Sequence, residues 1–184
     1  QIQRLIWPAL GLAVTLLLLA SLLAALKLRL ASTRPLPVYG TVADFTLTNQ
    51  LGQRITLADL KGKVWIADII FTRCAGPCPK MTRQMSALQA ALPADSTTKF
   101  VTLTTDPDFD TPPVLQAYAQ RFGADPARWF FLTGDKAQIA GLAVDSLKLT
   151  AVEKQPAERQ SPADLFIHST IFVVVDQRGQ LRGI

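Results

Sequence analysis

An uncharged run of 22 residues lies near the start of the chain. Residues 5–26 read L-I-W-P-A-L-G-L-A-V-T-L-L-L-L-A-S-L-L-A-A-L. As an α-helix this run would be about 33 Å long, which matches the hydrocarbon core of a bilayer. The apolar part of a cleaved signal peptide is shorter, about 7–15 residues, and no convincing cleavage site follows this run. We therefore predict an uncleaved single-pass membrane anchor over residues 1–30, rather than a signal peptide or a buried core helix.

The net charge of +5 is unevenly distributed along the chain. Residues 1–34 contain four basic residues and no acidic residue, whereas residues 35–184 carry the other 15 Lys and Arg against all 14 Asp and Glu. A nucleic-acid surface would need basic residues clustered on the folded domain. The nearly neutral domain therefore predicts no nucleic-acid partner.

The orientation of the anchor is ambiguous from its flanking charges. Lys27, Arg29 and Arg34 follow the apolar run and only Arg4 precedes it. By the positive-inside rule this bias favours a cytoplasmic C-terminal domain. Because the chain begins with Gln1 rather than Met, we expect a missing N-terminal segment, which could add basic residues on the other side.

The rest of the chain alternates strand and helix patterns. Residues 31–40, with two prolines, predict a stiff linker, and residues 41–184 a single α/β domain with a mixed sheet flanked by helices. The apolar run 64–71 is typical of a buried central strand. The other predicted elements are a hairpin of 44–48 and 54–57 with Gly52 in its loop, helices at 78–91, 111–122 and 135–143, strands at 99–105, 129–133, 169–176 and from 180, and an exposed loop at 154–163. Because such a fold continues through its last strand and a closing helix, we expect the C-terminal end to be truncated.

Both cysteines lie in the segment F-T-R-C-A-G-P-C-P-K-M, residues 71–81. Pro79 suits the first turn of a helix, so we expect Cys78 near the helix start and Cys74 in the loop before it. The helix N-terminus and the positive charge of Arg73 favour a thiolate, which is both a nucleophile and a metal ligand. A structural disulfide would close only a five-residue ring and stabilise little. Thiol–disulfide exchange and metal binding both remain open at this point, beside two free core cysteines.

The single histidine, His168, is the candidate third ligand. It stands at the start of the predicted strand 169–176, where a loop meets the edge of the sheet. Two thiolates and one imidazole suit Cu(I), which takes soft ligands at low coordination number, whereas structural zinc needs a fourth ligand. Met81 and Met85 are also soft, but their helical spacing favours a place in the core.

Residues 41–184 resemble the Sco/SenC family, membrane-anchored copper proteins that assist cytochrome c oxidase assembly. The resemblance implies a thioredoxin-like fold and one copper ion bound by Cys74, Cys78 and His168, as Cu(I) with Cu(II) as a further state. The family's D-P-x-x-D-T-P segment falls on residues 106–112, to which we assign no ligand role; Asp106 is expected to shape a loop near the site. The segments that carry the resemblance are D-F-T-L-T-N-Q-L-G-Q, L-K-G-K-V-W-I-A-D-I-I-F-T-R-C-A-G-P-C-P-K-M, T-L-T-T-D-P-D-F-D-T-P, F-I-H-S-T and D-Q-R-G.

The resemblance also implies a function, a copper metallochaperone for the dinuclear copper centre of cytochrome c oxidase. Its expected partners are the copper-site subunit of the oxidase, an upstream copper donor, a thiol reductant and, through the N-terminal helix, the membrane. It places the protein in a bacterial inner membrane with the domain on the periplasmic side, against the visible charge bias. The alternatives are a thiol–disulfide oxidoreductase, with Cys74 and Cys78 as its redox-active pair, and a copper or redox sensor.

Overall fold

The computed structural model describes residues 2–31, 36–161 and 164–184. Contacts between residues divide the chain into two units, residues 1–36 and residues 37–184. Part of the predicted linker, residues 32–35, lies outside the described residues, and Tyr39 already donates its backbone N–H to the carbonyl of Leu181 in the sheet. The proposed division into anchor, linker and domain therefore remains a prediction.

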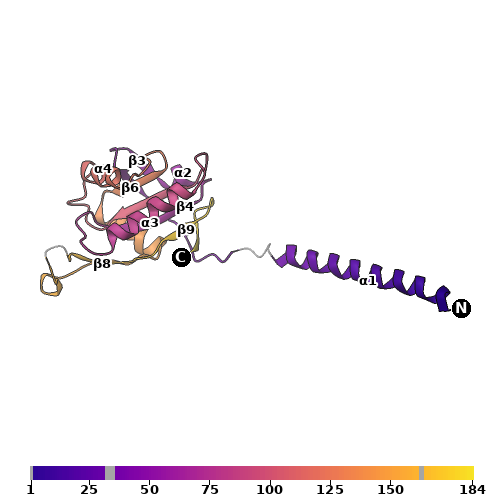
Figure 1. Ribbon diagram of the computed structural model, residues 1–184. Helices are drawn as coiled ribbons and strands as arrows, with labels where there is room; N and C mark the ends of the chain where they lie inside the picture. The colour runs from indigo at the N-terminus through magenta and orange to yellow at the C-terminus, as the bar shows by residue number, and fades with distance from the viewer. Residues whose placement is uncertain (1, 32–35, 162–163) are drawn as a thin grey trace. The chain divides into compact units, whose positions relative to one another are not determined.

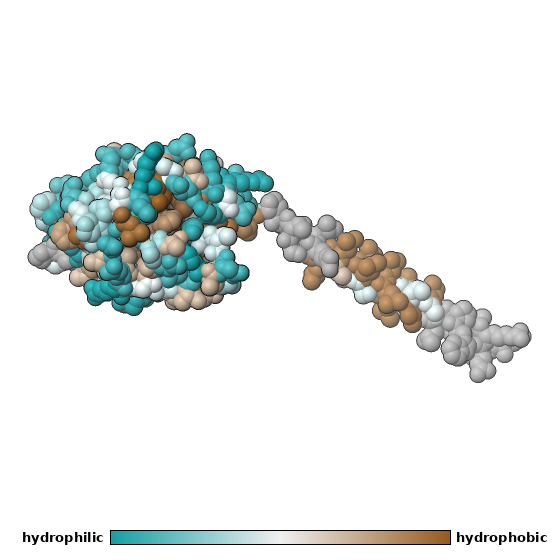
Figure 2. Space-filling model, turned by 90° about the horizontal axis from the view of Figure 1, so that it is seen from above, coloured by the Kyte–Doolittle hydropathy of each residue, from teal (hydrophilic) through white to brown (hydrophobic). Residues whose placement is uncertain are grey.

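The first unit is one helix, α1 (Ile2–Ala31), which contains the uncharged run. Its segment Gly11–Leu28 is long and apolar enough to cross a membrane, and none of that segment is buried in the protein. Figure 2 shows this segment as mostly brown with some pale patches, whereas the surface of the second unit is mixed. The helix is consistent with the predicted anchor by its length and composition alone.

The second unit is an α/β domain in which strands and helices alternate along much of the chain. Its strands are β1 (Gly40–Thr41), β2 (Thr46–Asn49), β3 (Arg54–Thr56), β4 (Trp65–Ile70), β5 (Lys99–Thr104), β6 (Trp129–Thr133), β7 (Ala151–Glu153), β8 (Phe166–His168), β9 (Val173–Val175) and β10 (Gln180–Gly183). Its helices are α2 (Leu57–Leu60), α3 (Cys78–Ala91), α4 (Pro112–Arg121) and α5 (Lys136–Ala140), with a π-helical turn at Gly141–Ser146 and a 3₁₀ turn at Pro156–Glu158.

Eight of the strands form one mixed sheet in the order β1-β10-β9-β4-β5-β6-β2-β3. β4, β5 and β6 run parallel, and α3 and α4 are the crossovers that parallel neighbours require (Figure 1). β9 pairs antiparallel with the other side of β4, and the predicted hairpin β2–β3 closes the far edge. The thioredoxin-like fold expected from the sequence is confirmed, with β4 near the middle of the sheet.

Both faces of β4 are buried, as its continuous apolar pattern predicts. Ala67 and Ile69 pack into one core cluster with residues of the π-helical turn, and Ile70 packs into a second cluster with α3 and α4. Met81 and Met85 lie in this second cluster, fully or almost fully buried. Their predicted role as core residues agrees with this position.

The prediction was wrong for the segment around His168. A single strand was expected over residues 169–176, but β9 begins only at Val173. Residues 166–168 instead form β8, which pairs with β7 in a separate two-stranded sheet in the register Ala151↔His168. His168 therefore ends a strand of a small hairpin rather than starting a strand of the main sheet. Between β7 and β8, residues 154–161 are mostly exposed, as predicted for 154–163. Residues 162–163 lie outside the described residues.

Candidate metal centre

The cysteine segment lies where β4 runs through a loop into α3. Cys78 is the first residue of α3 and Pro79 lies in its first turn, as the sequence predicts. Cys74 lies in the loop, and its backbone N–H donates a hydrogen bond to the carbonyl of Phe71 at 3.2 Å, which closes a turn. Cys78 is fully buried, whereas Cys74 is partly exposed, and neither forms a disulfide. The two thiols thus differ in access although they are four residues apart.

His168 reaches this pair from β8. Its Nε2 lies 3.2 Å from the Sγ of Cys78, and its Nδ1 lies 3.0 Å from the backbone oxygen of Ser169. Because a carbonyl oxygen only accepts, Nδ1 carries the hydrogen and Nε2 keeps its lone pair directed at the sulfur. The ring of Phe71 packs edge-on against the imidazole, with 5.8 Å between centroids. The imidazole is thus held in the tautomer that a metal ligand requires.

The three residues predicted as ligands lie together. One ligand atom of each of Cys74, Cys78 and His168 lies within 4.8 Å of those of the other two. Among the described residues, this is the only group of three His, Cys, Asp or Glu side chains with such geometry. The donor set of two sulfurs and one imidazole nitrogen fits a soft, low-coordinate metal ion.

The pKa values of the two thiols are shifted in opposite directions. The thiol of Cys78 donates to the sulfur of Cys74, and this hydrogen bond is the main reason why the pKa of Cys74 is lowered to about 4. The backbone N–H of Gly76 adds a second donor at 3.3 Å. The same hydrogen bond, with burial, raises the pKa of Cys78. At neutral pH the pair therefore holds one thiolate, on Cys74, and one proton, on Cys78.

Arg73 contributes less to the thiolate than its position in the sequence indicates. Its guanidinium pairs with the carboxylate of Asp106 at 2.5 Å and lies over the ring of Phe109, 4.1 Å from the centroid. Asp106 shapes the loop beside the site, as expected. The main cause that lowers the pKa of Cys74 is instead the hydrogen bond from the side chain of Cys78, to which the backbone N–H groups of Cys78 and Gly76 add.

A buried acid beneath the site was missed in the sequence. Asp68 is fully buried in β4, and its Oδ1 accepts a hydrogen bond from the hydroxyl of Thr102 at 2.7 Å. Its Oδ2 has no hydrogen-bond partner among the described residues. Burial raises the pKa of Asp68 to about 7, and its charge contributes to raising the pKa of both Cys78 and His168. The available signal was a single carboxylate within an otherwise apolar strand.

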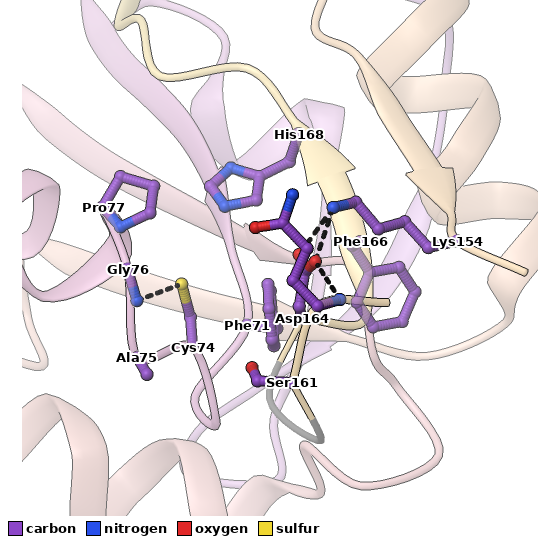
Figure 3. Close-up of a pocket in the computed structure, with 11 residues that line it drawn as sticks. Phe71, Cys74, Ala75, Gly76, Pro77, Lys154, Ser161, Asp164, Phe166 and His168 are labelled. Carbon is purple, nitrogen blue, oxygen red and sulfur yellow. Dashed lines mark hydrogen bonds and ion pairs between the residues drawn. The ribbon is translucent and has the colours of Figure 1, made fainter. Parts of the chain in front are cut away.

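A cavity of about 520 Å³ opens beside the thiols. Figure 3 shows Cys74 and His168 facing it from different walls, the first from the cysteine loop and the second from β8. On the hairpin side, Lys154 forms an ion pair with Asp164 at 2.7 Å. Because Cys74 lines the cavity and Cys78 is buried, an approaching thiol or metal donor meets Cys74 first.

Comparisons with known proteins agree with this geometry. The family model described as SCO1/SenC matches residues 35–184. Over 147 residues the chain is 35% identical to the SCO1 protein homolog of Bacillus subtilis (strain 168), which covers 79% of this chain and 73% of that protein.

Two solved structures are similar over most of the domain. Bradyrhizobium japonicum ScoI with copper bound is 25% identical, with a TM-score of 0.67, over 77% of this chain and 87% of its own. BsSco, described as a member of the Sco family of cytochrome c oxidase assembly proteins with a disulfide switch, is 33% identical. Its TM-score is 0.66, over 80% of this chain and 83% of its own.

Proposed function

The chain belongs to the SCO1/SenC family, and we propose that it is a membrane-anchored metallochaperone that carries one copper ion on Cys74, Cys78 and His168. The observation that carries this proposal is the meeting of three suitable ligand atoms within 4.8 Å, from a loop, a helix start and a separate hairpin. Copper bound to ScoI of Bradyrhizobium japonicum, a similar structure, supports the choice of metal.

The donor atoms of the site favour Cu(I), and its protonation state allows that ion to replace a proton. One thiolate and one thiol give the metal-free cysteine pair a charge of −1, since the pKa of Cys74 is low and that of Cys78 is raised. When Cu(I) replaces the proton of Cys78, two thiolates and one monovalent ion again sum to −1. Exchange of H⁺ for Cu⁺ thus leaves the charge of the cysteine pair unchanged, and soft sulfur ligands are those that Cu(I) prefers.

The recipient we propose is the copper-site subunit of cytochrome c oxidase, where the protein would help assemble the dinuclear copper centre. The similarity to BsSco, a member of a family of cytochrome c oxidase assembly proteins, supports this choice. Transfer would begin at Cys74, because its sulfur lines the cavity and can be exchanged for an incoming thiolate while Cys78 and His168 still hold the ion. We further propose that α1 anchors the domain on the periplasmic side of a bacterial inner membrane. There an upstream donor would supply copper, and a thiol reductant would keep the two cysteines reduced.

A second function, thiol–disulfide exchange, is favoured by one observation. Cys74 is partly exposed and has a pKa lowered to about 4, next to a buried, protonated Cys78. That arrangement suits an attacking thiolate with a resolving partner. Reduction of the recipient's cysteines and delivery of copper to them are compatible roles, because only reduced cysteines can take the metal.

Titration of the reduced protein with Cu(I) tests the proposed function. We expect one ion per chain and, at neutral pH, the release of about one proton per ion, because only Cys78 still holds one. A chromophoric chelator in competition reports the affinity, and a pH indicator in weak buffer reports the protons. Binding of no copper, or of half an ion per chain as in a site shared between two molecules, would contradict the proposal.

A further inference from the structure

The segment from β5 to α4 contains a buried carboxylate that the copper ligands do not account for. Asp110 is fully buried, and its side chain accepts three hydrogen bonds. Its Oδ2 accepts from the backbone N–H of Thr72 at 3.1 Å and from the hydroxyl of Thr104 at 2.5 Å, and its Oδ1 accepts from the hydroxyl of Thr72. Thr72 lies two residues before Cys74. The carboxylate therefore holds the start of the cysteine loop, residues 71–77 between β4 and α3, by hydrogen bonds.

The segment that carries Asp110 is itself well anchored. The backbone N–H of Asp110 donates to the carbonyl of Asp106 at 2.8 Å, and that of Asp106 donates to the hydroxyl of Thr104 at 2.9 Å. The N–H of Thr105 donates to the carbonyl of Ile70 at 2.8 Å, which ties the segment to the end of β4. Asp110 therefore connects the cysteine loop to the ends of the two central parallel strands.

The rest of the cysteine loop has fewer anchors of this kind. Arg73 is held by Asp106, but its side chain is 44% exposed, and ion pairs exposed to solvent stabilise little. Residues 75–77 are partly or fully exposed. Hydrogen bonds from several donors to a buried carboxylate are stronger than such an exposed ion pair, and removing one partner leaves a buried group unsatisfied. Among these contacts, the carboxylate of Asp110 is the main constraint on the loop before Cys74.

We propose that Asp110 is a positioning residue for the copper site, acting through Thr72 to keep the sulfur of Cys74 within reach of Cys78 and His168. This role rests on the proposed function for its copper readout. It also makes a prediction that needs no metal. A loosened loop brings the two sulfurs together less often, so the disulfide between them should form less readily.

The substitution Asp110→Asn tests this role, since the amide keeps the shape of the side chain but cannot accept at both of its polar atoms. We expect the affinity for Cu(I) to fall about 10–100-fold, the usual effect of losing a group that orients a ligand. Without metal, we expect the equilibrium constant for closing the Cys74–Cys78 disulfide against glutathione to fall by roughly tenfold. The matched control is Asp176→Asn, which removes a carboxylate that accepts from the backbone of Arg178 and Gln180 in the turn between β9 and β10. We expect the control to change neither value.

A second pair of variants covers the case in which Asp110→Asn does not fold. Thr72→Val removes one of the hydroxyl donors to Asp110, whereas Thr72→Ser keeps it. We expect the valine variant to weaken both copper binding and disulfide closure, and the serine variant to behave as the unchanged protein. Wild-type values for both Thr72→Val and any folded Asp110→Asn would overturn the role of Asp110. If the unchanged protein binds no copper, the proposed function fails, while the glutathione equilibrium still tests Asp110.

Discussion

Replacing Cys78 with serine is expected to weaken Cu(I) binding by on the order of 10²- to 10³-fold. A structural metal site of four ligands binds with roughly 10–16 kcal/mol, or about 2.5–4 kcal/mol for each ligand, and each 1.4 kcal/mol is a factor of ten. Serine removes a soft thiolate and supplies a hydroxyl that stays protonated at neutral pH. Competition with a chromophoric chelator for Cu(I) measures the change.

Two further variants separate the loss of a ligand from the disturbance of the core. Cys78 is fully buried, so Cys78→Ala controls for the burial of a hydroxyl and should weaken binding as much as serine does. Met85 lies on the same helix, is also fully buried and carries a soft sulfur. Because Met85 packs in the core, Met85→Leu should leave the affinity unchanged. Unaltered binding by Cys78→Ser, or loss of binding in Met85→Leu, would contradict the ligand set.

Oxidation of the cysteine pair is expected to abolish stoichiometric Cu(I) binding, and a dithiol reductant should restore it. In the structure both cysteines are free, and their sulfurs lie within 4.8 Å of one another. A disulfide requires about 2.05 Å between the sulfurs, so a small movement of the exposed loop would close it. Once closed, neither sulfur is a thiolate and only the imidazole of His168 remains, which is too little for a tight site. Copper titration before and after oxidation, with free thiols counted in parallel, measures the effect.

The control for oxidation is Cys74→Ser, which cannot form the bond within the chain. Its weak residual copper binding should be the same before and after treatment with a mild oxidant. Full binding by the oxidised, unchanged protein would show that the thiols are not the ligands. The redox state of the pair would then have no control over loading.

The position of the cysteine pair could be predicted from the sequence because local signals agree there. The continuous apolar run before it specifies a buried strand, and Pro79 marks the first turn of the helix after it. Both were confirmed in β4 and α3. The helix start, however, suggested a thiolate without saying which cysteine would carry it. The hydrogen bond between the two sulfurs lowers the pKa of Cys74, the cysteine in the loop, and raises that of Cys78.

The path by which His168 reaches the thiols could not be predicted from local patterns. β7 and β8 have three residues each, too few to show an alternating pattern, and they pair only with one another in the described part of the chain. Their place depends on tertiary contacts such as the edge-on packing of Phe71 against Phe166, with 5.1 Å between centroids. Ligand chemistry and family resemblance were enough to predict His168 as the third ligand. Only the folded structure shows that it lies on β8.

The buried carboxylates were missed for a related reason. Asp68 interrupts an apolar strand and Asp110 stands in a polar loop, and no local pattern shows that either is buried. Each is surrounded by residues far away in the sequence, Thr102 for Asp68 and Thr72 for Asp110. Pairing between parallel strands creates both environments, so only the assembled sheet reveals them.

Cu(I) titration of the reduced His168→Ala protein, beside the unchanged protein, tests the three-ligand site most directly. We predict that the affinity falls by on the order of 10²-fold, by the same estimate for each ligand. The rate at which the variant reduces a small disulfide should stay nearly unchanged, because Cys74 and Cys78 remain. Equal copper affinity in the two proteins would contradict the site, since the pair of sulfurs would then hold the ion without the imidazole that lies 3.2 Å from Cys78.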